Sequence, residues 1–189
     1  MSTGEPYILA ISGSLRPESL NTMLLRALGE FVPSTIRYEV VSDISALPFY
    51  DQRLEVDPPS SVLDLRSKVH EAHALILASP EYNYSYSGLL KNALEWLSRP
   101  VGSAVLEHKP VAILGAAPGL YGTVRAQAHL RQVLHGTNSV VLRRPEVYVN
   151  EASKKFDDTG KLIDPTARSL VEQLIYNLLS HLPENFEAA

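Results

Sequence analysis

The hydrophobic residues of this chain gather in five short runs, separated by longer stretches in which apolar and polar residues alternate. The run at 36–41 alternates apolar and polar residues, whereas the runs at 74–78 and 111–114 are apolar at every position. Short runs of this kind predict strands, and a strand apolar on both sides is typical of a parallel sheet covered by helices. The predicted strands are residues 7–11, 36–41, 74–78, 111–114 and 139–142.

Helical spacing of apolar residues fills the segments between these strands. Asp164 and Pro165 mark the start of the last helix, which we expect to run to Leu182, because aspartate caps helices and proline suits their first position. Strand and helix therefore alternate five times, which predicts an α/β domain with a parallel sheet of order 2-1-3-4-5. The other predicted helices cover residues 22–31, 62–72, 88–97 and 123–134.

Three unusual loops follow the first, third and fourth predicted strands, at residues 12–21, 79–87 and 115–122. In a doubly wound sheet all three open at the carboxyl edge of the strands, around the point where the strand order reverses. We therefore expect them to form one ligand crevice. A fourth connection, at residues 43–59, is long and contains three prolines, and long ordered loops are usually functional or interfacial.

Composition narrows the possible classes of protein. The chain has 189 residues, 45% of them hydrophobic, a net charge of -4 and no cysteine. A single domain, 1–189, is expected; thiol, disulfide and iron–sulfur chemistry is excluded, so any redox chemistry needs a bound cofactor. The mild acidity argues against nucleic-acid binding. No run approaches the roughly 18 apolar residues of a membrane span, and residues 1–6 lack the features of a signal peptide, which favours the cytoplasm.

The first loop combines hydroxyl groups, an amide and a permanent positive charge just before a predicted helix. The residues with this chemistry are Ser14, Arg16, Ser19, Asn21 and Thr22. Unpaired N–H groups at a helix N-terminus attract anions, so the loop predicts a phosphate site. The alternative is a plain helix cap by Ser19 or Asn21. The loop lacks both common nucleotide-binding glycine patterns, which favours a monophosphate over a triphosphate.

The second loop carries three tyrosines and an asparagine within residues 80–88, a composition suited to a flat ring system. Glu81 is a candidate general base, but a lone glutamate more often pairs with a cation or caps a helix. The six histidines form no close metal-binding pair, so no metal site is predicted.

Two motifs resemble those of the NADPH-dependent FMN reductase family, and in particular its bacterial chromate and quinone reductases. They are Gly-Ser-Leu-Arg-x-x-Ser-x-Asn from Gly13, and Pro-Glu-Tyr-Asn-x-Ser-x-x-Gly-x-Leu-Lys-Asn-Ala-x-x-Trp-Leu from Pro80. The resemblance covers nearly the whole chain. It implies a flavodoxin-like three-layer sandwich that binds FMN without a covalent link, and hydride transfer from NADPH or NADH through FMN to a quinone or similar small acceptor in ping-pong order.

The resemblance also assigns residues to the cofactor. Around the FMN phosphate it places Ser14, Arg16, Ser19 and Asn21, with the backbone amides of Leu20 and Thr22. Along the flavin ring it places Pro80, Glu81, Tyr82 and Asn83, with Tyr84 and Ser85 close by. Arg16 could instead hold the extra phosphate of NADPH. No side chain is expected to be catalytic, because the flavin carries the chemistry.

The third loop is expected to contact the flavin through Ala117, although Ala116 and Ala117 stand where many relatives carry hydroxyl groups. Arg125 and the stretch around His129 also match relatives, and we expect them to lie on a helix surface or a subunit contact. The family usually forms dimers or tetramers, and residues 47–51 with the helix from Gly88 offer an apolar dimer surface. The rival functions are a reductase that releases reduced FMN to a partner, and a non-enzymatic flavodoxin-type electron carrier.

Overall fold

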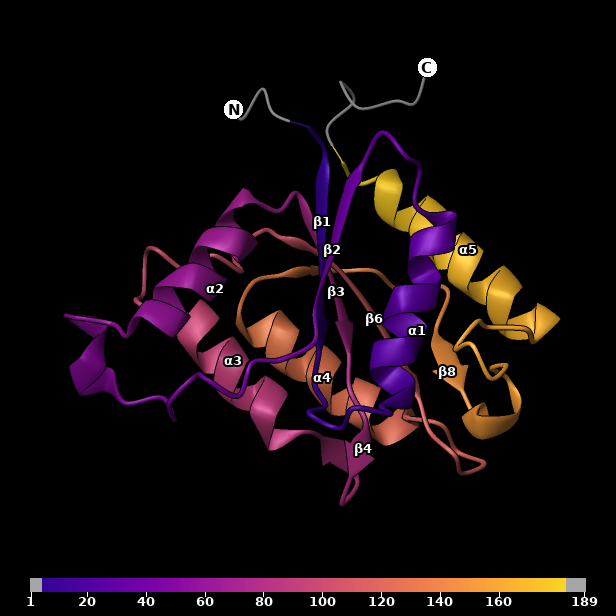
Figure 1. Cartoon of the computed structure of the whole chain (residues 1–189). Helices are drawn as coiled ribbons and strands as arrows, with labels where there is room; N and C mark the ends of the chain where they lie inside the picture. Colours follow the sequence, from indigo (N-terminus) through magenta and orange to yellow (C-terminus); the bar gives the residue numbers. More distant parts are fainter. Residues whose placement is uncertain (1–4, 183–189) are drawn as a thin grey trace.

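The computed structural model describes residues 5–182 and has three layers, with a parallel sheet between two layers of helices (Figure 1). The sheet has the order β2-β1-β3-β6-β7, and β8 pairs with the end of β6, after the part that pairs with β7. Every ladder of this sheet is parallel. Its strands are β1 (Tyr7–Ser12), β2 (Arg37–Val41), β3 (Ala74–Ala78), β6 (Pro110–Ala116), β7 (Val140–Val141) and β8 (Val147–Val149). The predicted α/β class and the predicted path of the chain across the sheet are confirmed.

The fifth strand position differs from the prediction, because two short strands share it. Val140 and Val141 pair with the start of β6, and Val147–Val149 pair with its end. Between them lies Pro145, which has no N–H to donate to a ladder. The alternation Val-Tyr-Val at β8 was the available signal for the second piece. A second feature that the periodicity missed is the small hairpin of β4 (Glu81–Tyr82) and β5 (Ser85–Tyr86).

Five α-helices cover the sheet. They are α1 (Leu20–Leu28), α2 (Ser60–Glu71), α3 (Gly88–Leu97), α4 (Val124–Gly136) and α5 (Pro165–Leu179), with short 3₁₀ turns at Gly29–Phe31, Gln52–Glu55 and Ala152–Lys154. The carboxylate of Asp164 accepts the N–H of Ala167 at 2.8 Å, so α5 begins where the sequence predicted. It ends three residues before the expected Leu182. Among residues 5–182, none of these helices has both the length and the apolar character required to cross a membrane.

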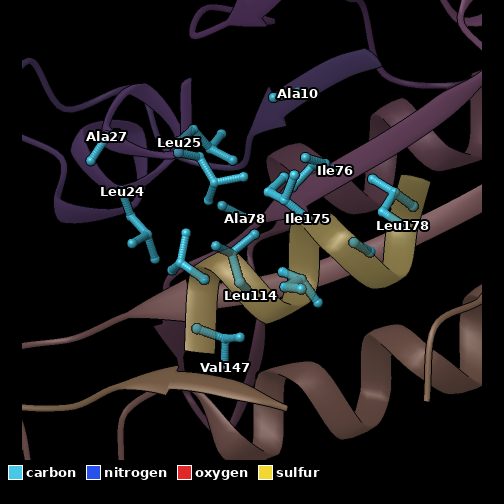
Figure 2. Packing of buried hydrophobic residues seen from close by; sticks show 14 of the residues in the cluster. Ala10, Leu24, Leu25, Ala27, Ile76, Ala78, Leu114, Val147, Ile175 and Leu178 are labelled. Atoms are coloured by element: carbon cyan, nitrogen blue, oxygen red, sulfur yellow. The ribbon is translucent and has the colours of Figure 1, made fainter. Parts of the chain in front are cut away.

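The hydrophobic core has two halves, one on each face of the sheet. Alternate residues of β3 point to opposite sides: Ile76 packs with α1 and α5, whereas Leu75 and Leu77 pack with α2, α3 and α4. Figure 2 shows the first half, where Ile175 of α5 lies beside Ile76 and Leu114 lies near Ala78. All five residues of β3 are buried, as expected for a strand covered on both faces. Burial of this sheet fixes where the loops at its carboxyl edge emerge.

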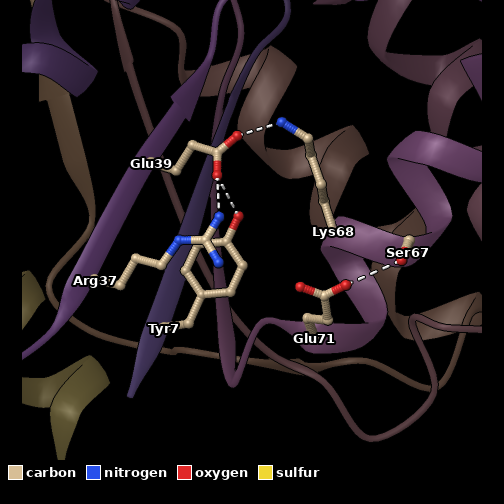
Figure 3. A network of polar contacts seen from close by, with 6 residues as sticks. All are labelled: Tyr7, Arg37, Glu39, Ser67, Lys68 and Glu71. Carbon is tan, nitrogen blue, oxygen red and sulfur yellow. Dashed lines mark hydrogen bonds and ion pairs between the residues drawn. The ribbon is translucent and has the colours of Figure 1, made fainter. Parts of the chain in front are cut away.

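A network of polar side chains lies near the opposite, amino end of the sheet (Figure 3). The carboxylate of Glu39 accepts hydrogen bonds from the Tyr7 hydroxyl and the Arg37 guanidinium, each at 2.8 Å, and pairs with Lys68. The Arg37 guanidinium also lies 4.0 Å from the centroid of the Tyr7 ring. Each charged group in this network faces a protein partner.

Candidate functional site

The first and second loops meet at Gly13, directly after β1. Its N–H donates to the carbonyl of Ala78 at 2.7 Å. A Cβ added at Gly13 would lie 2.9 Å from the Ser87 hydroxyl and 3.2 Å from that carbonyl, so only glycine fits without displacement. This close approach brings together the two loops that the sequence assigned to one crevice.

Ser14 and Ser19 in the first loop each accept a backbone N–H and keep their own hydroxyl protons available. Ser19 Oγ accepts the N–H of Thr22 at 3.3 Å and is the N-cap of α1, so the capping interpretation is confirmed. Ser14 Oγ accepts the N–H of Arg16 at 3.4 Å. These serines are only 6% and 4% exposed, for Ser14 and Ser19 respectively. A hydroxyl that accepts a hydrogen bond still has one O–H to donate, so a cap and a phosphate ligand are compatible.

Asn21 and Thr22 have tasks inside the protein. The Asn21 side chain donates to the carbonyl of Ala116 at 3.0 Å and accepts the N–H of the same residue at 2.9 Å. Its amide therefore ties the first loop to the end of β6, where the third loop begins. The Thr22 hydroxyl lies 2.8 Å from Ser12 Oγ, and its N–H is taken by Ser19. The N–H of Leu20, in the first turn, has no such side-chain acceptor among the described residues.

Arg16 is the exposed cation of the first loop. Within residues 5–182, its guanidinium has no hydrogen-bond, ion-pair or ring partner. An arginine of this kind can bind a phosphate through its planar fork of donors.

The second loop is a tight two-residue hairpin. Its turn is Asn83 and Tyr84, with φ angles of 49° and 69°, a left-handed conformation that asparagine adopts readily and tyrosine rarely. Ser85 Oγ lies 3.0 Å from Nδ1 of His129 on α4. At the base of the hairpin, Ser79 Oγ donates to the carbonyl of Pro80 at 2.9 Å. The hairpin leaves Tyr82 and Tyr84 largely exposed at the edge of the site.

Glu81 both caps a helix and binds a cation. One carboxylate oxygen accepts the N–H groups of Arg125 and Ala126, at 3.0 and 3.1 Å, and the other pairs with the Arg125 side chain. The Glu81 side chain is 8% exposed. The predicted pairing with a cation and capping of a helix are therefore both found. Any contact of Glu81 with a ring ligand would come from its backbone.

Arg125 connects the second and third loops. Its guanidinium carbon lies 4.0 Å from the centroid of the Tyr84 ring and 5.4 Å from that of Tyr121. The sequence favoured a helix surface or subunit contact for this arginine, and the structure places it partly exposed in the first turn of α4, next to the second and third loops. Its partner Glu81 is 44 residues away in sequence, so no local pattern could reveal the pair.

The third loop is bound to the strand that follows it. Ala117 donates its N–H to Val149 and accepts the N–H of Ala152, both at 3.0 Å. Both polar backbone groups of Ala117 are thus engaged within the protein, and the methyl group is what it offers to a ligand. Gly115 lies near the end of β6, just before this loop, where an added Cβ would fall 2.1 Å from the Thr123 hydroxyl. The loop therefore has a fixed path.

Comparison with known proteins identifies the chain. Residues 6–154 match the family model for NADPH-dependent FMN reductase. The chain belongs to this family. An NAD(P)H-dependent FMN reductase of Pseudomonas aeruginosa is 42% identical over 172 residues, covering 90% of this chain and 92% of the relative. A 2-hydroxy-1,4-benzoquinone reductase of a Burkholderia species is 37% identical over 165 residues, covering 87% and 90%.

Solved structures agree with this family. The flavoenzyme NAD(P)H:(acceptor) oxidoreductase from Paracoccus denitrificans superposes with a TM-score of 0.85 at 30% identity, covering 93% of this chain and 96% of the other. A flavodoxin from an archaeon, at 15% identity and a TM-score of 0.58, supports the fold alone. The protein is thus a flavodoxin-like oxidoreductase that uses FMN and NAD(P)H.

The first loop of this FMN reductase family member suits a phosphate monoester. Two buried hydroxyl groups keep a proton to donate, and an arginine without a protein partner lies beside them. Three or more His, Cys, Asp and Glu residues grouped to hold a metal ion are not found in the part of the chain that the structure describes.

Proposed function

We propose that this protein reduces quinones, or similar small acceptors, with electrons from NAD(P)H, through FMN bound at the carboxyl edge of the sheet. The observation that carries this proposal is the joining of the three loops into one framework. Gly13 of the first loop is hydrogen-bonded to Ala78, directly before the second loop. The Asn21 side chain is hydrogen-bonded to the end of β6, before the third loop, and the Glu81 carboxylate accepts an N–H at the start of α4. A cofactor that bridges the loops would therefore meet a rigid site, which favours precise placement.

The proposed phosphate anchor consists of side chains with donors to spare. The Ser14 and Ser19 hydroxyl groups and the Arg16 guanidinium bind the phosphate, together with the N–H of Leu20 and the positive end of the α1 dipole. Asn21 and Thr22 act through the backbone or by shaping the loop, because their side chains are engaged with Ala116 and Ser12.

The proposed ring site follows the second loop. Pro80, Glu81 and Asn83 border the ring by their backbone, and Ala117 contacts it by its methyl group. Tyr82, Tyr84 and Ser85 lie at its rim. When bound, FMN supplies the group that accepts a hydride from NAD(P)H and passes it on. The protein orients the donor and acceptor in turn on one face, which predicts ping-pong kinetics.

Turnover with a quinone tests this function directly. The purified protein, loaded with FMN, is expected to oxidise NADPH or NADH in the presence of 1,4-benzoquinone. Initial rates at several quinone concentrations should give parallel double-reciprocal lines, as a ping-pong order requires. A fully FMN-loaded protein without turnover would refute the reductase function and favour an electron carrier.

Two further measurements separate the rival functions. Quinones are favoured as acceptors because the similar proteins from Burkholderia and from Escherichia coli are named as quinone reductases. If FMN is required at substrate concentrations and leaves the protein when reduced, the flavin-releasing alternative is correct. A panel of quinones, azo compounds and metal oxyanions would then rank the acceptors by kcat/KM.

The loop at residues 47–51 supports a proposed homodimer or homotetramer. Asn92 and Trp96 of α3 both donate to the carbonyl of Pro48 at 2.9 Å, which holds the loop on that helix. The neighbouring Phe49 is 88% exposed. An ordered loop that displays a phenylalanine to solvent suits a subunit interface. Light scattering at micromolar concentration should give at least twice the 20.8 kDa chain mass, and a monomer would refute the interface.

Two broader assignments remain proposals. We propose that 1–189 form one FMN-binding domain, although residues 1–4 and 183–189 lie outside the described part of the chain. We also propose that the enzyme acts in the cytoplasm, where NAD(P)H is supplied. Limited proteolysis and cell fractionation test these two points.

A further inference from the structure

A polar cavity lies next to the proposed phosphate anchor. It has a volume of about 310 Å³ and opens between the first loop, α1 and the segment after β2. Its lining is mostly polar or charged, and it includes neither Ser14 nor Ser19 of the anchor. The lining residues are Leu15, Arg16, Pro17, Thr22, Arg26, Ser42, Asp43 and Ser45.

Two arginines without protein partners line this cavity. Arg26 projects from α1, and Glu30, one turn further along, pairs with Arg168 at 3.1 Å instead of Arg26. Over residues 5–182, neither the Arg26 nor the Arg16 guanidinium has a hydrogen-bond, ion-pair or ring partner. Other arginines of the fold do have partners: Arg125, for example, pairs with Glu81.

The remaining polar groups of the cavity complement an anion attached to a sugar. Ser42 brings a hydroxyl group that can donate to a phosphate oxygen, whereas the Ser45 hydroxyl donates to the carboxylate of Asp43. Asp43 is the one carboxylate in the lining, and one of its oxygens accepts the N–H of Ser45 at 2.8 Å. Two arginines against one aspartate leave a positive balance, while the carboxylate can accept a hydrogen bond from a ribose hydroxyl.

We propose that this cavity binds the 2′-phosphate of NADPH, and that Arg26 thereby makes the enzyme prefer NADPH to NADH. The proposal rests on the function proposed above. Two guanidinium groups that line one cavity suit a phosphate monoester, because each presents a planar fork of donors. NADH carries a neutral hydroxyl at the same position, so it gains nothing from Arg26. Arg16 lies between this cavity and the FMN anchor, whereas Arg26 belongs to the cavity alone.

Kinetics of the FMN-loaded enzyme test the assignment of Arg26. For Arg26→Gln we expect the KM for NADPH to rise about 10- to 100-fold, the range of a lost hydrogen bond to a charged group. The KM for NADH and the Kd for FMN should stay within about twofold, since a factor of two is under 0.5 kcal/mol. Arg26→Lys should recover part of the affinity for NADPH. Arg143→Gln removes the same charge at an exposed site outside the cavity and should change neither KM.

A binding measurement gives a second readout that does not depend on turnover. Isothermal titration calorimetry of the FMN-loaded protein with 2′,5′-ADP and with 5′-AMP compares two ligands that differ by the 2′-phosphate. Tighter binding of 2′,5′-ADP, lost in Arg26→Gln, supports the proposal. Equal binding of both, or an advantage that Arg26→Gln retains, overturns it.

The outcomes also separate the two possible sources of the phosphate. If Arg26→Gln weakens FMN retention and leaves the ratio of KM values for NADPH and NADH unchanged, the cavity serves the FMN phosphate and our assignment is wrong. If the unaltered enzyme shows no NAD(P)H oxidation but still prefers 2′,5′-ADP, the function proposed above fails while the cavity assignment stands.

Discussion

The two ends of the same parallel sheet treat polar groups in opposite ways. Near the amino end, Glu39 receives Tyr7, Arg37 and Lys68, so its charge is matched by neighbouring side chains (Figure 3). At the carboxyl edge, Ser14 and Ser19 are buried with an O–H still to donate. Arg16 next to them has no protein partner within residues 5–182.

This contrast separates stability from binding within one fold. Where charged side chains are paired with each other, they have no hydrogen-bonding capacity left for a ligand. Removing one of them lowers the free energy of unfolding. Where donors are buried but only half used, the protein keeps hydrogen-bonding capacity that a phosphate can satisfy. The contrast predicts that removing the partly used donors of the first loop changes ligand binding first, and that substitutions in the paired network at the amino end change only stability.

The largest expected effect is on FMN retention. Arg16→Ala combined with Ser19→Gly should weaken FMN binding about 100- to 1,000-fold, because a charged and a neutral hydrogen bond to phosphate are lost. Glycine is chosen at position 19 because, as an N-cap, it lowers helix stability by only a few tenths of a kcal/mol, whereas alanine costs about 1 kcal/mol. Fluorescence of released FMN during dialysis measures the loss.

The matched control for that double variant is Arg143→Ala with Ser169→Gly, at sites away from the three loops. It should retain FMN like the unaltered protein. If the Arg16 and Ser19 double variant also keeps its flavin through extensive dialysis, the phosphate anchor is misassigned and the contrast between the two ends fails.

A second test addresses how tightly the third loop is packed. Gly115→Ala places a Cβ 2.1 Å from the hydroxyl of Thr123, which is fully buried, so either the loop or α4 must move. We expect a loss of about 1–3 kcal/mol in the free energy of unfolding, as for other overpacked sites. Gly88→Ala is the control, because an added Cβ meets nothing within 4 Å there. Urea unfolding of both variants should separate them, and equal stability would contradict the packing argument.

The sequence predicted those parts of the molecule that depend on local patterns. The order of strands and helices follows from hydrophobic periodicity, and the start of α5 follows from Asp164 and Pro165. The split fifth strand and the hairpin at Asn83 were missed, because two- and three-residue strands exist only through their partners in space. The engaged backbone of Ala117 depends on β8, and so could not be foreseen without it.

The same reasoning explains the outcome at Glu81. The sequence predicted an ion pair or a helix cap for Glu81, since those tasks are common for glutamate, and the structure shows both. It could not name the partner, because Arg125 comes close only after the sheet is assembled. Site residues joined by tertiary contacts are therefore predictable as types but not as pairs.

Glu81→Gln should give an intermediate loss in the free energy of unfolding. Glutamine keeps one oxygen for the N–H groups at the start of α4 but loses the ion pair, so we expect unfolding to become easier by about 1–2 kcal/mol. The control is Glu95→Gln, which breaks an exposed pair with Lys91 and should cost under about 0.5 kcal/mol. A double-mutant cycle with Arg125→Gln isolates the coupling. Coupling no larger than that between Lys91 and Glu95 would contradict the proposed link between the loops.

The smallest expected effect is the pH dependence contributed by Glu39 at the amino end. The hydrogen bond from Lys68 is the largest influence on the pKa of Glu39, and together with Tyr7 and Arg37 it holds that pKa below its usual 4.5 although burial acts in the opposite direction. A carboxyl group whose pKa is lower in the folded state stabilises the fold above the unfolded pKa, and that contribution is lost as the pH falls below about 5. Because the pair is partly exposed, we expect under about 1 kcal/mol.

Urea unfolding at pH values between about 3 and 7 measures this contribution, as the difference in slope between the unaltered protein and Glu39→Gln. Glu172→Gln, at an exposed helix position, is the control and should keep the slope of the unaltered protein. FMN affinity should be the same in all three proteins, because Glu39 faces its partners at the end of the sheet remote from the phosphate loop. A change in FMN affinity with Glu39→Gln would show that the two ends are coupled, and the division between a stabilising end and a binding end would have to be abandoned.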